Sequence, residues 1–123
     1  MKVLKSISMI ALIVITVFSV HAQKMPDPVG TWKFYAEEAP YEYNTGDIVI
    51  EKEGEEYTAK IVFGEYYEIK AQDFLFEGDQ ISFKAYIEDD VIYIKGTVTE
   101  DSLDGKASYS EGTIGFKSKR KKS

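Results

Sequence analysis

Carboxylates are the chemically active side chains that this chain carries in number. Its 123 residues include 21 Asp and Glu, but a single histidine, His21, and no cysteine. His21 falls in a segment that we expect to be cleaved. The sequence therefore predicts no thiol nucleophile, no Ser–His relay and no His or Cys metal site.

Two acidic stretches, Glu88–Asp90 and Asp101–Gly105, look at first like calcium ligands. Neither has the ordered spacing of a calcium-binding loop, and acidic residues are common in tight turns. A glycosidase would need a defined pair of carboxylates, and nothing in the sequence distinguishes one pair from the others. We therefore expect no catalytic residues, no metal and no cofactor, and a protein that is not an enzyme.

Aromatic side chains offer binding chemistry instead. Tyr41 and Tyr43 lie beside a proline in the longest connection, Glu37–Gly46, while the others lie at the ends of predicted strands. The candidate ligand-binding residues are Tyr41, Tyr43, Phe63, Tyr67 and Tyr109. Grouped at one opening, these rings could stack on a sugar, a flat ring or an apolar chain. Alternatively they pack on one another as a plug above a solid interior.

Short strands must position these residues, because apolar and polar side chains alternate with a period of two almost throughout residues 31–120. The eight predicted strands are residues 31–36, 47–52, 56–63, 66–76, 80–87, 91–98, 102–109 and 113–120. Most connections are short enough for hairpins only, which predicts an antiparallel meander. A change of phase near Gln72 and Asp73 predicts a bulge in the fourth strand.

A meander of eight strands leaves two exposed edges unless its first strand pairs with its last. We therefore predict an all-β fold, an eight-stranded antiparallel up-and-down barrel. Alternation places Trp32 and Arg120 inside one rim, and Phe63, Tyr67 and Tyr109 at the opposite rim. Barrels of this size are filled by side chains or hold one small ligand, and the sequence leaves both open.

The chain resembles the lipocalin-like barrels of the calycin superfamily at two places. Gly30-Thr31-Trp32 fits the Gly-X-Trp pattern of their first strand, and Arg120 lies near the end of the last. The resemblance covers residues 30–120 and implies that Arg120 packs across Trp32 and closes one end of the barrel. This chain is shorter than most lipocalins, and its sequence shows no helix after the last strand and no disulfide.

Physical chemistry supports this structural closure, because an indole face offers a buried guanidinium a cation–π contact worth roughly 0.5–2 kcal/mol. The alternative is that Arg120 anchors a ligand carboxylate, as in fatty-acid carriers. We favour the structural role, because Arg120 would lie at the closed end and no second inward Lys or Arg accompanies it.

The N-terminus has the pattern of a secretory signal peptide over residues 1–22. Lys2 and Lys5 precede 14 uncharged residues, Ile7–Val20, and Ala22 is a small residue suited to cleavage. We expect a lead-in at residues 23–29, the barrel at 30–120 and a basic tail at 121–123. The sequence has no cysteine that could carry a lipid, and we expect no membrane span after signal cleavage. The product is therefore expected in the periplasm or outside the cell.

The charge distribution narrows the partners. Between Lys24 and Glu111 there are 21 acidic residues and 8 lysines, a net charge of −13, whereas residues 117–122 return five positive charges. Because residues 24–111 are so acidic, they repel nucleic acid, and we exclude nucleic acid as a partner. The basic end is most simply a solvated terminus that protects a terminal strand.

The sequence therefore predicts a lipocalin-like protein that binds a small neutral or apolar ligand at the open end of its barrel. The alternative is a protein-binding module, an inhibitor or an accessory of an envelope complex, with a filled barrel. Ligand identity and oligomeric state are not predicted.

Overall fold

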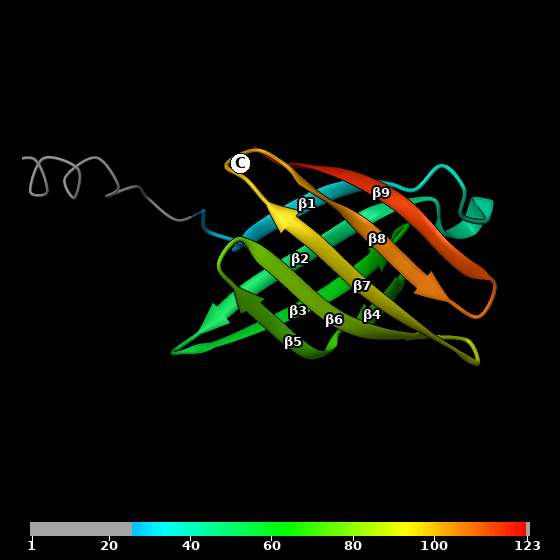
Figure 1. The fold of residues 1–123 in the computed structure, drawn as a ribbon, viewed down its shortest axis with the longest axis horizontal. Helices are drawn as coiled ribbons and strands as arrows, with labels where there is room; N and C mark the ends of the chain where they lie inside the picture. The colour runs from blue at the N-terminus through cyan, green and yellow to red at the C-terminus, as the bar shows by residue number, and fades with distance from the viewer. Residues whose placement is uncertain (1–25, 123) are drawn as a thin grey trace, which may run out of the picture.

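The computed structural model describes residues 26–122, which form nine strands and one short 3₁₀ turn (Figure 1). The predicted signal peptide, residues 1–22, lies outside the described residues. The elements are β1 (Gly30–Tyr35), η1 (Tyr41–Tyr43), β2 (Thr45–Glu53), β3 (Glu56–Phe63), β4 (Tyr67–Lys70), β5 (Gln72–Glu77), β6 (Gln80–Ile87), β7 (Asp90–Val98), β8 (Leu103–Tyr109) and β9 (Gly112–Arg120). No helix within residues 26–122 is long and apolar enough to cross a membrane.

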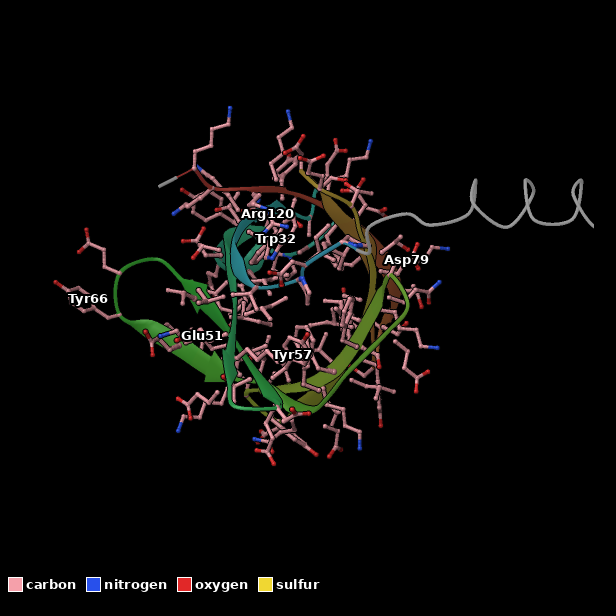
Figure 2. The ribbon with its side chains drawn as sticks, turned by 90° about the vertical axis from the view of Figure 1, so that its left-hand side faces the viewer. Trp32, Glu51, Tyr57, Tyr66, Asp79 and Arg120 are labelled. Carbon is pink, nitrogen blue, oxygen red and sulfur yellow. The ribbon has the colours of Figure 1, made fainter. Side chains whose placement is uncertain are left out.

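All neighbouring strands are antiparallel, in the order β4-β3-β2-β1-β9-β8-β7-β6-β5. The first and last strands pair directly, with Trp32 opposite Arg120 and Phe34 opposite Ser118. This pairing curls the sheet into a nearly closed antiparallel barrel, as Figure 2 shows from the end where β1 begins and β9 ends. The predicted all-β barrel is confirmed.

The predicted eight strands become nine because the fourth divides at Ala71. β4 pairs with β3, and β5 pairs with β6 with a shift of register between Gln72 and Leu75. Asp73 has a left-handed backbone, with φ at 54°, and its carboxylate contacts Lys84 Nζ at 3.1 Å. The predicted bulge is therefore present, but it re-aims the chain enough to give two strands with different partners.

Side chains close the remaining gap between β3 and β5. Tyr57 packs against Phe74 and Phe76, with ring centroids 6.0 and 5.7 Å apart. Figure 2 shows Tyr57 pointing into the ring of strands. Aromatic packing thus substitutes here for a continuous ladder of backbone hydrogen bonds.

The most completely buried large side chains of the core lie toward the Trp32 end. Trp32, Ile50, Ile81, Val98 and Leu103 are at most 1% exposed. Gly96 faces this core, and a methyl group placed on it would lie 2.8 Å from Leu103 Cδ1. The free volume that a glycine on an inward position would leave is therefore taken up by Leu103.

Candidate functional site

A cavity of about 220 Å³ opens at the end of the barrel opposite Trp32. It lies at the end where η1 and the β6–β7 and β8–β9 turns meet, on the right in Figure 1. Its walls come from inward positions of seven strands, from the β1–β2 connection and from Glu88 in the β6–β7 turn. They comprise Phe34, Ala36, Ala39, Pro40, Tyr43, Ile48, Ile61, Phe63, Ile87, Glu88, Asp90, Ile92, Ile94, Ala107, Tyr109, Ile114 and Phe116.

The β1–β2 connection, residues 36–44, is folded over this cavity. The amide of Ala36 donates to the carbonyl of Asn44 at 2.7 Å, which joins its two ends, and Tyr43 N donates to Pro40 O at 2.8 Å within η1. Ala39 and Pro40 present apolar surface to the cavity. The longest loop of the barrel is thus a partial cover of the opening.

Tyr43 anchors this cover to the barrel. Its ring packs edge-on against Phe63, with centroids 5.1 Å apart, and lies 6.5 Å from the ring of Tyr67. Phe63 in turn contacts Phe34 at 5.8 Å and Tyr67 at 5.9 Å. The cluster holds the cover against β3 and β4 while leaving the volume beneath it empty.

The predicted ligand-binding residues fall into two groups. Tyr43, Phe63 and Tyr109 line the cavity, and the structure brings them together. Tyr67 supports Tyr43 and Phe63 from outside the lining, and Tyr41 is 91% exposed. Their role in binding a ligand remains a prediction.

Most of the cavity wall is aliphatic rather than aromatic, and the predicted ligand-binding residues included only the aromatic part of it. The aliphatic lining residues of the strands, such as Ile61, Ile94 and Ala107, share the inward phase of their strands. The period-two alternation of each strand was the sequence signal that could have identified these lining residues. Ala39 and Pro40 lie outside any strand, so no period could have placed them.

Two carboxylates stand at the mouth of the cavity. Glu88 Oε1 accepts a hydrogen bond from the Tyr43 hydroxyl at 3.0 Å, and Asp90 Oδ2 accepts one from the Ser110 hydroxyl at 2.6 Å. The hydrogen bond to Glu88 raises the pKa of Tyr43, and desolvation and the Glu88 charge act in the same direction. No Lys or Arg belongs to the lining, so the site is electrostatically unsuited to an anion.

The opposite end is closed by Arg120. Its guanidinium carbon lies 4.2 Å from the centre of the Trp32 ring. Nη1 donates to Val29 O at 2.6 Å, Nη2 to Asp27 O at 2.7 Å and Nε to Glu100 O at 2.9 Å. One side chain thereby ties the lead-in segment and the β7–β8 turn across the end of the barrel.

Gly30 makes this arrangement possible. Its φ is +146°, and a Cβ atom there would approach Arg120 Nη1 to 2.9 Å. Two residues later, Trp32 Nε1 donates to Pro28 O at 3.0 Å, so the buried indole has its one donor satisfied. The Gly-X-Trp spacing is therefore explained by the space that the guanidinium occupies.

The acidic turns do not converge. Within residues 26–122 no three His, Cys, Asp or Glu side chains are grouped so that they could hold a metal ion. Asp90 instead accepts a hydrogen bond from the amide of Val91, and Asp104 accepts one from the amide of Ser118. Asp90 thus stabilises the start of β7, and Asp104 links β8 to β9.

Comparisons with known proteins bear on the fold. No family model matches the chain, and no curated protein matches it in sequence. A solved structure of a redesigned β-barrel is similar, with a TM-score of 0.51 and 10% sequence identity over 77% of this chain and 91% of that one. The fold is that of a β-barrel. At this identity the likeness extends to architecture and not to function.

Proposed function

We propose that this chain is a lipocalin-like binding protein that holds a small neutral or apolar ligand in the cavity beneath residues 36–44. The observation that carries the proposal is the cavity itself, about 220 Å³ with almost entirely apolar walls. An apolar cavity of about 150 Å³ in another protein stays dry and binds benzene. A ligand of one or two rings, or a short aliphatic chain, therefore fits the available space.

The mouth residues restrict the charge of the ligand. Glu88 and Asp90 flank the opening without a lining cation, so a carboxylate ligand would face repulsion that a neutral or cationic one would not. Arg120 is at the opposite end, where three backbone carbonyls and the Trp32 ring already engage its guanidinium. It is therefore unsuited to anchor a fatty-acid carboxylate.

The lipocalin-like assignment is supported by Gly30-Thr31-Trp32 and by Arg120 stacked on the tryptophan. The proposed location, periplasmic or extracellular, is supported by the signal-like sequence of residues 1–22. We propose binding rather than catalysis, because the carboxylates near the cavity are engaged by Tyr43, Ser110 and a backbone amide. The alternative of a filled barrel that only displays a loop to another protein is disfavoured by the cavity.

Calorimetric titration with indole, naphthalene and octanoate tests this function. We expect the two neutral probes to bind and the anionic octanoate to bind at least about tenfold more weakly. Ala107→Leu, which adds three carbons to the cavity wall, should weaken indole binding by at least about tenfold. Ser108→Leu adds a similar side chain next to Ala107 but on the outer face, and should leave binding unchanged.

Native mass spectrometry of the protein purified from its own host would identify the physiological ligand. An adduct that is present in the unsubstituted protein and lost in Ala107→Leu would support the cavity as its site. Failure to bind either neutral probe, together with no adduct, would contradict the carrier function and favour the protein-binding alternative.

A further inference from the structure

The outer surface of the barrel is divided by charge in a way that the ligand cavity does not explain. Outward positions of β6, β7, β8, β9 and β1, five adjacent strands, carry a set of lysines that we call the lysine wall. It consists of Lys33, Lys84, Lys95, Lys106, Lys117 and Lys119. Asp104 is the one acidic side chain on the outward positions of these strands. The remaining acidic residues near this wall lie mainly in the turns at the two rims.

Four lysines of the wall face one another in pairs across neighbouring strands. Lys95 of β7 is directly opposite Lys106 of β8, and Lys33 of β1 is directly opposite Lys119 of β9. Like charges directly opposite across an antiparallel pair destabilise a sheet. Among residues 26–122, these four lysines make no ion pair with a carboxylate. A sequence that is acidic overall has thus concentrated uncompensated positive charge on one face.

The opposite wall of the barrel, formed by β2, β3 and β4, also carries a facing pair of lysines, but there an acidic partner is present. Lys60 of β3 is also directly opposite a lysine, Lys70 of β4, but Lys60 Nζ contacts Glu68 Oε1 at 3.3 Å. Lys121 at the border of the two walls contacts Asp47 Oδ2 at 2.8 Å. On the lysine wall itself, Lys84 Nζ contacts Asp73 Oδ2 at 3.1 Å. The two facing pairs, Lys95 with Lys106 and Lys33 with Lys119, have no such neutralisation among residues 26–122.

Exposed aromatic and hydroxyl groups accompany the lysines. Tyr35, Tyr86 and Tyr93 project from the same strands and are 51%, 53% and 53% exposed. A shallow hollow on this wall is lined by Tyr93, Lys95, Lys106, Ser108 and Thr113 among others. Cations, aromatic faces and hydroxyls therefore alternate on one open sheet surface, which suits a chain of anionic sugars.

We propose that the lysine wall binds an anionic polysaccharide laid across strands β6 to β1. Charge complementarity selects a polyanion, and the tyrosine faces and hydroxyls select sugar rings. The acidic rims at both ends repel a densely charged polymer or an extended anionic plane more than a narrow, sparsely charged chain. A polysaccharide is therefore favoured over nucleic acid and over a membrane. This proposal is independent of the ligand cavity.

Binding to alginate fragments and to hyaluronan fragments, both sparsely charged, measured against uncharged dextran over a series of salt concentrations, tests the proposal. We expect both anionic glycans to bind, dextran not to bind, and affinity to fall as salt is raised. Lys95→Gln/Lys106→Gln should weaken binding by about tenfold or more and flatten the salt dependence. Tyr93→Ala should weaken binding with little change in the salt dependence.

The matched control is Lys60→Gln/Lys70→Gln, which makes the same change of charge at a cross-strand pair on the opposite wall. It should leave glycan affinity within about twofold of the unsubstituted protein. Equal losses in the two double variants, or no binding of either glycan, would overturn the proposal. So would tighter binding to single-stranded DNA or to phosphatidylglycerol vesicles. Far-UV circular dichroism establishes that each variant is folded.

Discussion

The two ends of this barrel are made from the same strands and yet differ in almost every physical respect. At the Trp32 end the largest side chain is fully buried, its indole donor is satisfied, and Arg120 ties three backbone carbonyls over it. At the Tyr43 end a loop and an aromatic cluster cover a cavity of about 220 Å³. One end is thus closed by buried side chains and hydrogen bonds, whereas the other holds the apolar cavity in which we propose that a ligand binds.

The difference has a simple origin in residue size and polar satisfaction. Trp32 and Leu103 fill the space at the closed end, including the space beside Gly96. Toward the mouth, inward positions on β8 and β9 carry Ala107 and Ile114, which do not reach across the barrel. The same barrel is therefore filled by side chains at the Trp32 end and hollow at the Tyr43 end.

The largest effect is expected at the closed end. Trp32→Ala should lower the free energy of unfolding by about 3–5 kcal/mol, because it leaves a large cavity where a fully buried side chain was. Urea denaturation monitored by circular dichroism measures this loss. A change below about 1 kcal/mol would mean that the tryptophan does not hold the end closed.

Removal of the Arg120 guanidinium should have the next largest effect on the free energy of unfolding. Arg120→Met keeps an apolar chain over Trp32 but leaves the carbonyls of Asp27, Val29 and Glu100 without their donor, at a cost of about 2 kcal/mol. Arg120→Lys should recover less than half of this loss, since an ammonium cannot span the same carbonyls as a planar fork. Lysine as stable as arginine in the same denaturation experiment would contradict the assigned geometry.

Added volume should have opposite consequences at the two ends. Gly96→Ala adds one carbon against Leu103 Cδ1 and should cost about 1–2 kcal/mol. Ala107→Leu adds three carbons to the cavity and should change stability by less than about 1 kcal/mol, in either direction. Thermal unfolding of the two variants provides the comparison. A larger loss at Ala107 than at Gly96 would show that the mouth is as full as the closed end.

The smallest effect concerns the cover and its dependence on pH. Tyr43→Phe removes the hydrogen bond to Glu88 and keeps the ring, so the loss of stability should be slight. Because the folded protein raises the pKa of Tyr43 above 10.0, this contribution is present at neutral pH and disappears as pH rises through the raised value. The melting temperatures of the two proteins should therefore converge above pH 10. A gap that widens with pH would contradict the Tyr43–Glu88 contact.

The strands could largely be predicted from the sequence, because period-two alternation reports which face is buried. The predicted 56–63 and 80–87 strands have the observed bounds, and most others differ by one or two residues. The division of the fourth strand was not predicted. A left-handed Asp73 carries no signal comparable to a glycine, and its geometry depends on pairing with β6 and on Lys84.

The candidate site was harder to predict for a related reason. Tyr43, Phe63 and Tyr109 were placed at the mouth by strand phase and by adjacency to a proline, and they do line the cavity. Tyr41 has the same neighbours in sequence, but residues 41–43 form a 3₁₀ turn, in which period two does not apply. Whether the interior was hollow depended on how far side chains such as Ala107 and Ile114 reach across the barrel, which requires coordinates.

The contrast between the ends can be tested most directly with xenon, which occupies dry apolar cavities. A crystal pressurised with xenon should show bound atoms among Ile61, Ile94 and Ala107 beneath the β1–β2 connection, and none beside Trp32. The same crystal grown from Ala107→Leu should lose that density. Xenon beside Trp32, or none at the Tyr43 end of the unsubstituted protein, would contradict the division of this barrel into a filled end and a hollow one.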